Sequence, residues 1–127
     1  MTLLTRPIPR LVLLLLLPFV FSACSVEDDR PAVWSFIQPA IIQPSCATAR
    51  CHSKFTATQG LRFDSIDDSY TYLVDGEFVD RMGNAEGSRL IWLLEGREVR
   101  LRMPPEAPLP DKDIDLIYRW ILDGVPR

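Results

Sequence analysis

Two cysteines and the only histidine of the chain lie between Cys46 and His52. Four residues separate Cys46 from Cys51, and His52 follows directly. Because the segment is so short, any fold of this chain must hold the two thiols and the imidazole close together. The related pattern Cys-x-x-Cys-His attaches haem covalently, with the thiols bonded to the two vinyl groups and the imidazole bound to the iron. We therefore interpret Cys46, Cys51 and His52 as a covalent haem attachment site.

The spacing of the two cysteines is longer than in that pattern by two residues. If both thiols are to reach the vinyl positions, the residues between them must bulge outward. Ala47, Thr48 and Ala49 are small enough to do so with little steric conflict. The sequence thus predicts an outward loop between two thioether anchors.

A second axial ligand is usual for haem iron in such sites, and the single histidine excludes a bis-histidine pair within the chain. A methionine thioether is the natural candidate. Met1 lies in a segment that we expect to be removed, which leaves Met82 and Met103. Met103 precedes two prolines, whose fixed backbone angles favour a rigid extended loop, whereas Met82 lies in a turn-prone stretch. We expect Met103 to be the ligand, with Met82 as the second choice.

Several short motifs occur in a defined order and at approximately defined spacings along most of the mature chain. They are Ile41 to His52, Gly60 to Phe63, Gly87 to Leu90, Met103 to Pro105 and Trp120 to Gly124. In this arrangement the chain resembles the small planctomycete-type cytochrome c domain. The resemblance implies an all-α, cytochrome c-like domain around one covalent haem c, which carries single electrons. It also implies Cys46 and Cys51 as thioether anchors and His52 and Met103 as axial iron ligands.

The first residues have the character of a targeting segment. Arg6 and Arg10 precede an apolar run from Leu11 to Phe21 that is too short to span a membrane as a helix. Phe21 to Cys24 resembles a bacterial lipoprotein cleavage box. We expect residues 1–23 to be a signal peptide and Cys24 to be lipidated; secretory cleavage near Ala23 and an uncleaved anchor are the alternatives.

The expected location is the cell envelope, with the lipid-anchored domain facing the periplasm or the exterior. Ser25 follows Cys24 in place of the aspartate that resemblance associates with inner-membrane retention, which favours the outer membrane. Residues 24–32 are polar and lack periodicity, as expected of a tether. Residues 33–127 form the predicted domain, whose modest core a covalent haem would reinforce. Lipid and haem together account for all three cysteines.

The charge of the mature chain is negative, because removal of residues 1–23 leaves 12 basic and 17 acidic side chains and a net charge of −5. This balance is unfavourable for binding nucleic acid. It is compatible with docking to a basic redox partner protein in the cell envelope. No catalytic acid and base pair or phosphate-binding loop is evident, so we do not expect an enzyme.

Apolar residues recur at helical spacing and show no strand alternation of useful length, which agrees with the all-α fold that the resemblance implies. The first helix covers Val33 to Ile41, with Pro39 expected to kink or end it. Leu61 and Phe63 are expected to form part of a pocket wall. Three further helices are expected, each starting at a capping residue and ending at a glycine. They run from Ser65 to Gly76, from Ser88 to Gly96 and from Asp111 to Gly124. By resemblance, Ile117, Trp120 and Ile121 of the last helix should meet Phe36 and Ile37 of the first.

Two other functions stay open for the cysteine cluster. A Cys46–Cys51 disulfide would be favoured in an oxidising compartment and would make the chain a haem-free lipoprotein interaction module. A haem-based sensor, in which Met103 is displaced by a ligand, is the second. A zinc site is less favoured, because no further cysteine pair or histidine completes a tetrahedral set.

Overall fold

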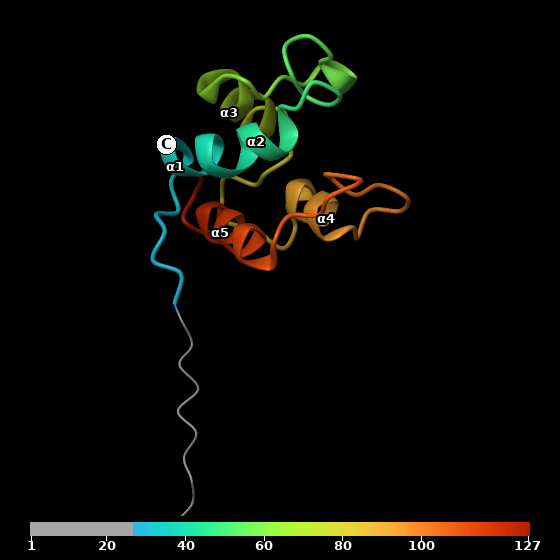
Figure 1. Cartoon of the computed structure of the whole chain (residues 1–127). Helices are drawn as coiled ribbons and strands as arrows, with labels where there is room; N and C mark the ends of the chain where they lie inside the picture. The colour runs from blue at the N-terminus through green and yellow to red at the C-terminus, as the bar shows by residue number, and fades with distance from the viewer. Residues whose placement is uncertain (1–26) are drawn as a thin grey trace, which may run out of the picture.

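A computed structural model describes residues 27–127 of the protein (Figure 1). About 44% of these residues are helical and none lies in a strand, which confirms the all-α class. The predicted signal peptide, residues 1–23, and the predicted lipidation site, Cys24, lie outside the described residues. From residue 27 onward, no helix has both the length and the apolarity to cross a bilayer.

The first helical rod consists of three consecutive pieces: α1 (Trp34–Ile37), the π-helical turn η1 (Gln38–Ile42) and α2 (Gln43–Cys46). Its path continues past Pro39, which is the second residue of the wide turn η1. Proline lacks an amide hydrogen and its ring crowds the carbonyl four residues earlier, so a wider turn relieves the conflict. The expected interruption at Pro39 is therefore a local widening that does not end the helix. The rod finishes at Cys46 and so delivers this thiol to the site.

Helix α3 (Ile66–Val74) begins as the sequence predicts. The Ser65 hydroxyl accepts a hydrogen bond from the amide of Asp68 at 3.3 Å, which satisfies one of the free amides of the first turn. The helix ends before Gly76, as expected. A Cβ at Gly76 would lie 2.2 Å from the carbonyl oxygen of Tyr72, so only glycine fits there.

Helix α4 (Arg89–Glu95) also starts after the predicted serine, but Ser88 does not cap it through its side chain. The Ser88 hydroxyl accepts from the amide of Asp80 and donates to the carbonyl of Asn84, each at 2.9 Å. It therefore pins the preceding loop to the helix start. Gly96 ends the helix in a left-handed conformation, with φ of 72°, as predicted.

Helix α5 (Asp111–Leu122) is the longest helix within the described residues. The prediction that Asp111 caps it is wrong by one position, because Asp111 is its first residue and Pro110 holds the cap position without a side-chain hydrogen bond. The carboxylate of Asp111 still lies in the first turn, where the helix dipole favours negative charge. Gly124, with φ of 80°, follows the last turn as expected.

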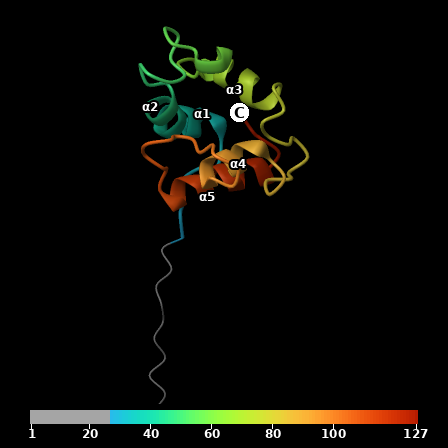
Figure 2. The ribbon, with the colours of Figure 1, turned by 90° about the vertical axis from the view of Figure 1, so that its right-hand side faces the viewer.

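The core lies where the rod packs against α5 and α3 (Figures 1 and 2). Trp34 of α1 stacks on Trp120 of α5 with ring centroids 4.9 Å apart, and Tyr70 of α3 meets Trp34 edge-on at 5.9 Å. Both tryptophans are fully buried, as are Ile37 and Ile117. The predicted packing of the last helix against the first is thus present, and Trp34 carries its aromatic contact.

The residues before α1 are tied to the domain by Arg30. Its guanidinium binds the carboxylate of Asp113 at 2.6 Å and the carbonyl of Lys112 at 2.9 Å, both at the start of α5. Arg30 also pairs with Asp28, and this hydrogen bond lowers the pKa of the Asp28 carboxyl to about 2. The last part of the predicted tether is therefore held against the domain through charge.

Candidate functional site

The loop that follows α2 carries the two thiols and the imidazole. The amide of His52 donates to the carbonyl of Cys46 at 3.0 Å, and the amide of Cys51 donates to the carbonyl of Thr48, also at 3.0 Å. These bonds close the loop across the inserted residues. Thr48, Ala49 and Arg50 are exposed, whereas Ala47 packs partly against the core. The backbone thus returns His52 beside Cys46 although five residues lie between them.

His52 itself is buried, with 8% of its surface exposed. Its carbonyl accepts from the amide of Phe63 at 2.7 Å, and the two rings lie 4.8 Å apart. The Nδ1 atom is buried and has no hydrogen-bond partner among the described residues. An imidazole held in place by its backbone and by an aromatic neighbour, with a polar atom unsatisfied, is unusual for a purely structural histidine.

A cavity of about 640 Å³ adjoins this loop. This volume falls within the range of about 300–1,000 Å³ that is usual for small-molecule and cofactor sites. Cys46, His52 and Met103 all line it. The rest of the wall is mostly apolar: Ile42, Leu61, Phe63, Leu73, Phe78, Leu90, Leu93, Leu94 and Leu101, with Thr58, Gln59 and Arg89.

Met103 reaches the cavity from an irregular segment after α4. Its amide donates to the carbonyl of Leu93 at 2.9 Å, so the backbone at this position is fixed to the helix. Met82, the second choice of the sequence analysis, is 92% exposed and does not line the cavity. The structure therefore brings together His52 and Met103 on one cavity and leaves Met82 on the surface.

Both cysteines of the loop are free thiols in the structure. Cys46 lines the cavity, and its burial, with a smaller effect from Cys51, raises its pKa to about 12. Its thiol therefore stays protonated at neutral pH. Cys51 is half-buried and lies outside the cavity wall, held through its carbonyl, which accepts from the hydroxyl of Thr58 at 2.9 Å. A disulfide between the two is not formed here.

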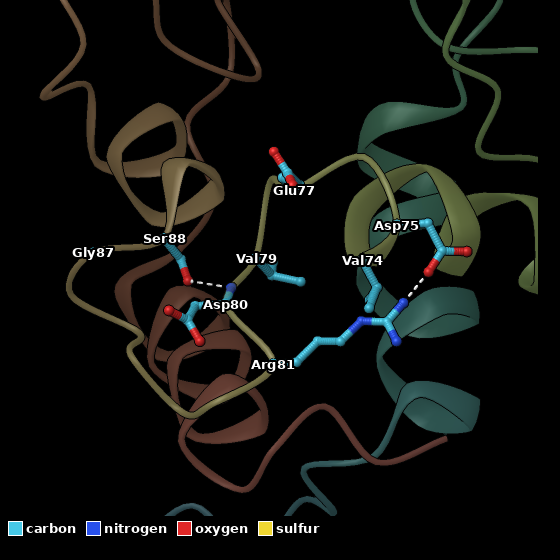
Figure 3. Close-up of a pocket in the computed structure, with 8 residues that line it drawn as sticks. All are labelled: Val74, Asp75, Glu77, Val79, Asp80, Arg81, Gly87 and Ser88. Atoms are coloured by element: carbon cyan, nitrogen blue, oxygen red, sulfur yellow. Dashed lines mark hydrogen bonds and ion pairs between the residues drawn. The ribbon is translucent and has the colours of Figure 1, made fainter.

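A second, open depression of about 520 Å³ lies between α3 and α4 (Figure 3). Its wall is polar: Arg81 extends to the carboxylate of Asp75 and pairs with it, and Ser88 holds the amide of Asp80. Among residues 27–127, no three histidine, cysteine or acidic side chains come close enough together to hold a metal ion. We therefore place the candidate site at the apolar cavity.

The cavity contains residues that the sequence analysis identified and others that it missed. Leu61 and Phe63 were expected in its wall, and they are there. Phe78 and Leu101 were missed, because each lies in a loop where no periodic pattern marks it as inward-facing. Only contacts between distant segments place them, and a single sequence does not reveal such contacts.

Comparisons with protein-family models, with curated proteins and with solved structures find no match to this chain. The assignment of a function therefore depends on the residues of the chain itself and on the cavity that they form. Three of those residues matter most, because Cys46, His52 and Met103 line the same cavity.

Proposed function

We propose that the chain is a membrane-tethered monohaem c-type cytochrome of the planctomycete-type family. It carries single electrons between redox partner proteins of the cell envelope, with lipid on Cys24 as its anchor. One observation supports this above all others: Met103 lines the same largely apolar cavity as Cys46 and His52, although at least fifty residues separate it from them in the sequence. This is the ligand set of a covalently attached haem with histidine and methionine ligation.

Cys46, His52 and Met103 line the cavity and fit such a group, whereas Cys51 is close in sequence but lies outside the cavity wall. A haem bound in the cavity would supply one-electron chemistry at its iron. His52 and Met103 would be the iron ligands, and Cys46 and Cys51 would be the covalent anchors. The apolar wall would exclude water, and the buried Nδ1 of His52 has no hydrogen-bond partner among the described residues.

The chain holds both ligands through its backbone. The carbonyl of His52 is bonded to Phe63, and the amide of Met103 is bonded to Leu93 of α4. Rigid ligands favour electron transfer because little rearrangement is needed when the charge at the centre changes. A methionine ligand also raises the reduction potential relative to a second histidine.

A redox titration tests this function. The protein is produced in a host with a cytochrome c maturation system, and its Soret absorption is followed as the applied potential changes. We expect a single transition of one electron in the wild type and in Gln59→Ala, which alters a polar residue of the same cavity wall. His52→Ala should lose the wild-type spectrum. A wild-type protein without Soret absorption would contradict the proposal.

A further inference from the structure

The basic side chains of residues 27–127 fall into two groups. The first makes ion pairs with acidic side chains: Arg30, Arg81, Arg89, Arg97, Arg119 and Arg127. The second makes no ion pair within the described part of the chain: Arg50, Lys54, Arg62, Arg100, Arg102 and Lys112. All members of the second group except Lys112 lie in two loops, residues 50–62 and 99–105.

These two loops are also free of acidic residues. No aspartate or glutamate occurs between Asp29 and Asp64 or between Glu98 and Glu106. The loops carry five basic and no acidic residues, whereas the remainder of residues 27–127 carries seven basic and all 17 acidic ones. Although the net charge of the mature chain is negative, these two loops are therefore positively charged.

Both loops border the candidate haem cavity. Thr58, Gln59 and Leu61 of the first loop and Leu101 and Met103 of the second line its wall. The loops lie on the right-hand side of the domain in Figure 1, which is the side that faces the viewer in Figure 2. The unpaired cations of these loops thus lie on the two segments that contribute to the cavity wall, although none of them lines the cavity itself. The polar depression of Figure 3, with its acidic side chains, lies elsewhere.

Large apolar side chains are exposed on the same loops. Phe55 and Val99 are each 86% exposed. The ammonium group of Lys54 lies 5.0 Å from the ring centroid of Phe55, so charge and apolar surface are combined at one place. Exposed apolar side chains among charged ones are typical of surfaces that bind another protein.

We propose that this basic rim, defined as Arg50, Lys54, Arg62, Arg100 and Arg102 together with Phe55 and Val99, docks the acidic surface of a partner protein. Opposite charge would orient the partner toward the two loops that line the cavity, because long-range attraction acts before contact. The identification of the partner as a redox protein rests on the proposed function. The existence of the basic rim does not depend on it. The net charge of −5 favours a basic partner, but the distribution of charge around the cavity favours an acidic one.

A binding experiment with a stand-in for an acidic protein tests the rim. The full mature chain carries Cys24→Ser, which prevents lipidation, and is passed at low ionic strength over immobilised poly-L-glutamate. We expect binding that weakens steeply with added salt. Arg100→Glu and Lys54→Glu should each weaken it about tenfold. Lys112→Glu is the matched control, because it reverses one unpaired cation outside the rim and changes the net charge by the same amount; it should bind as the parent does.

The contrary results are equally definite. If the chain does not bind poly-L-glutamate, or if Lys112→Glu weakens binding as much as the rim variants do, the proposed docking role of the rim is contradicted. Binding to phosphatidylglycerol vesicles or to duplex DNA that equals or exceeds binding to poly-L-glutamate would assign the rim to another class of partner and overturn the proposal. Formation of dimers through the rim, detected by sedimentation and lost in Arg100→Glu, would do the same. The binding measurement does not require haem. Failure of the docking proposal is therefore distinguishable from failure of the proposed function, which would appear as a lack of Soret absorption.

Discussion

At the residue scale, the two internal methionines make a matched pair for testing the iron ligand. Met103→Ala should abolish the sulfur-to-iron charge-transfer band of the ferric protein and lower its reduction potential by on the order of 100 mV, because the axial ligand sets the potential. Met82→Ala should leave both unchanged, since Met82 is 92% exposed and remote from the cavity wall. Ferric absorption spectra and potentiometry measure the two effects. Loss of the band in Met82→Ala alone would assign the ligand to Met82.

The thiol of Cys46 provides a test of the cavity that does not depend on haem. Burial raises its pKa to about 12, so in the haem-free protein the thiol keeps its proton over the neutral range and reacts slowly. As the pH rises toward that value, the thiolate fraction grows about tenfold per unit, and alkylation should accelerate in proportion. Alkylation by iodoacetamide of the Cys24→Ser, Cys51→Ser chain, followed by mass spectrometry, measures it. A plateau reached near pH 9 would show that Cys46 is not buried in this way.

At the scale of the elements, Gly76 limits how α3 can end. A Cβ there would meet the backbone oxygen of Tyr72 at 2.2 Å, so Gly76→Ala must displace the main chain and should cost about 2–3 kcal/mol of unfolding free energy. Gly60→Ala is the control, because nothing lies within 4 Å of its Cβ and only its positive φ opposes alanine. That change should cost about 1 kcal/mol. Chemical denaturation of the haem-free proteins compares them, and equal costs would refute the steric argument.

Much of the helical framework follows from local signals in the sequence. Ser65 caps α3, Gly96 ends α4 in a left-handed turn and Gly124 follows α5, because each of these residues meets a local backbone requirement. The pattern of Ile117 and Trp120 likewise marks the buried face of the last helix. Such features depend on neighbours within a few residues, which a single sequence displays.

Other features depend on contacts between distant segments, and the sequence did not reveal them. Ser88 was expected to cap α4, but its hydroxyl binds the backbone of Asp80 and Asn84 instead. The widened turn at Pro39 and the inward placement of Phe78 and Leu101 depend in the same way on what packs nearby. For the site, Cys46, His52 and Met103 were predicted from residue type, whereas the shape of the cavity that joins them required the fold.

At the scale of the whole molecule, the cavity is a weakness that a bound group would remove. The cavity of about 640 Å³ has a largely apolar wall in a domain of about 95 residues, and a group bound there would add contacts to that wall. Covalent haem should therefore raise the midpoint of thermal unfolding relative to the haem-free chain, by about 10 °C or more, since a ligand of the folded state stabilises it. Circular dichroism at rising temperature measures both forms. Equal midpoints would mean that haem does not fill the cavity.

The proposed covalent attachment of haem through the cysteine loop can be tested by intact mass spectrometry. The chain and its Cys46→Ser, Cys51→Ser double variant are produced together with a cytochrome c maturation system and extracted with acidified acetone. We predict that the wild-type chain retains the added mass of one haem after extraction and that the double variant does not. A colourless wild-type chain that is two hydrogens lighter than the reduced polypeptide, as a Cys46–Cys51 disulfide would make it, would contradict the account.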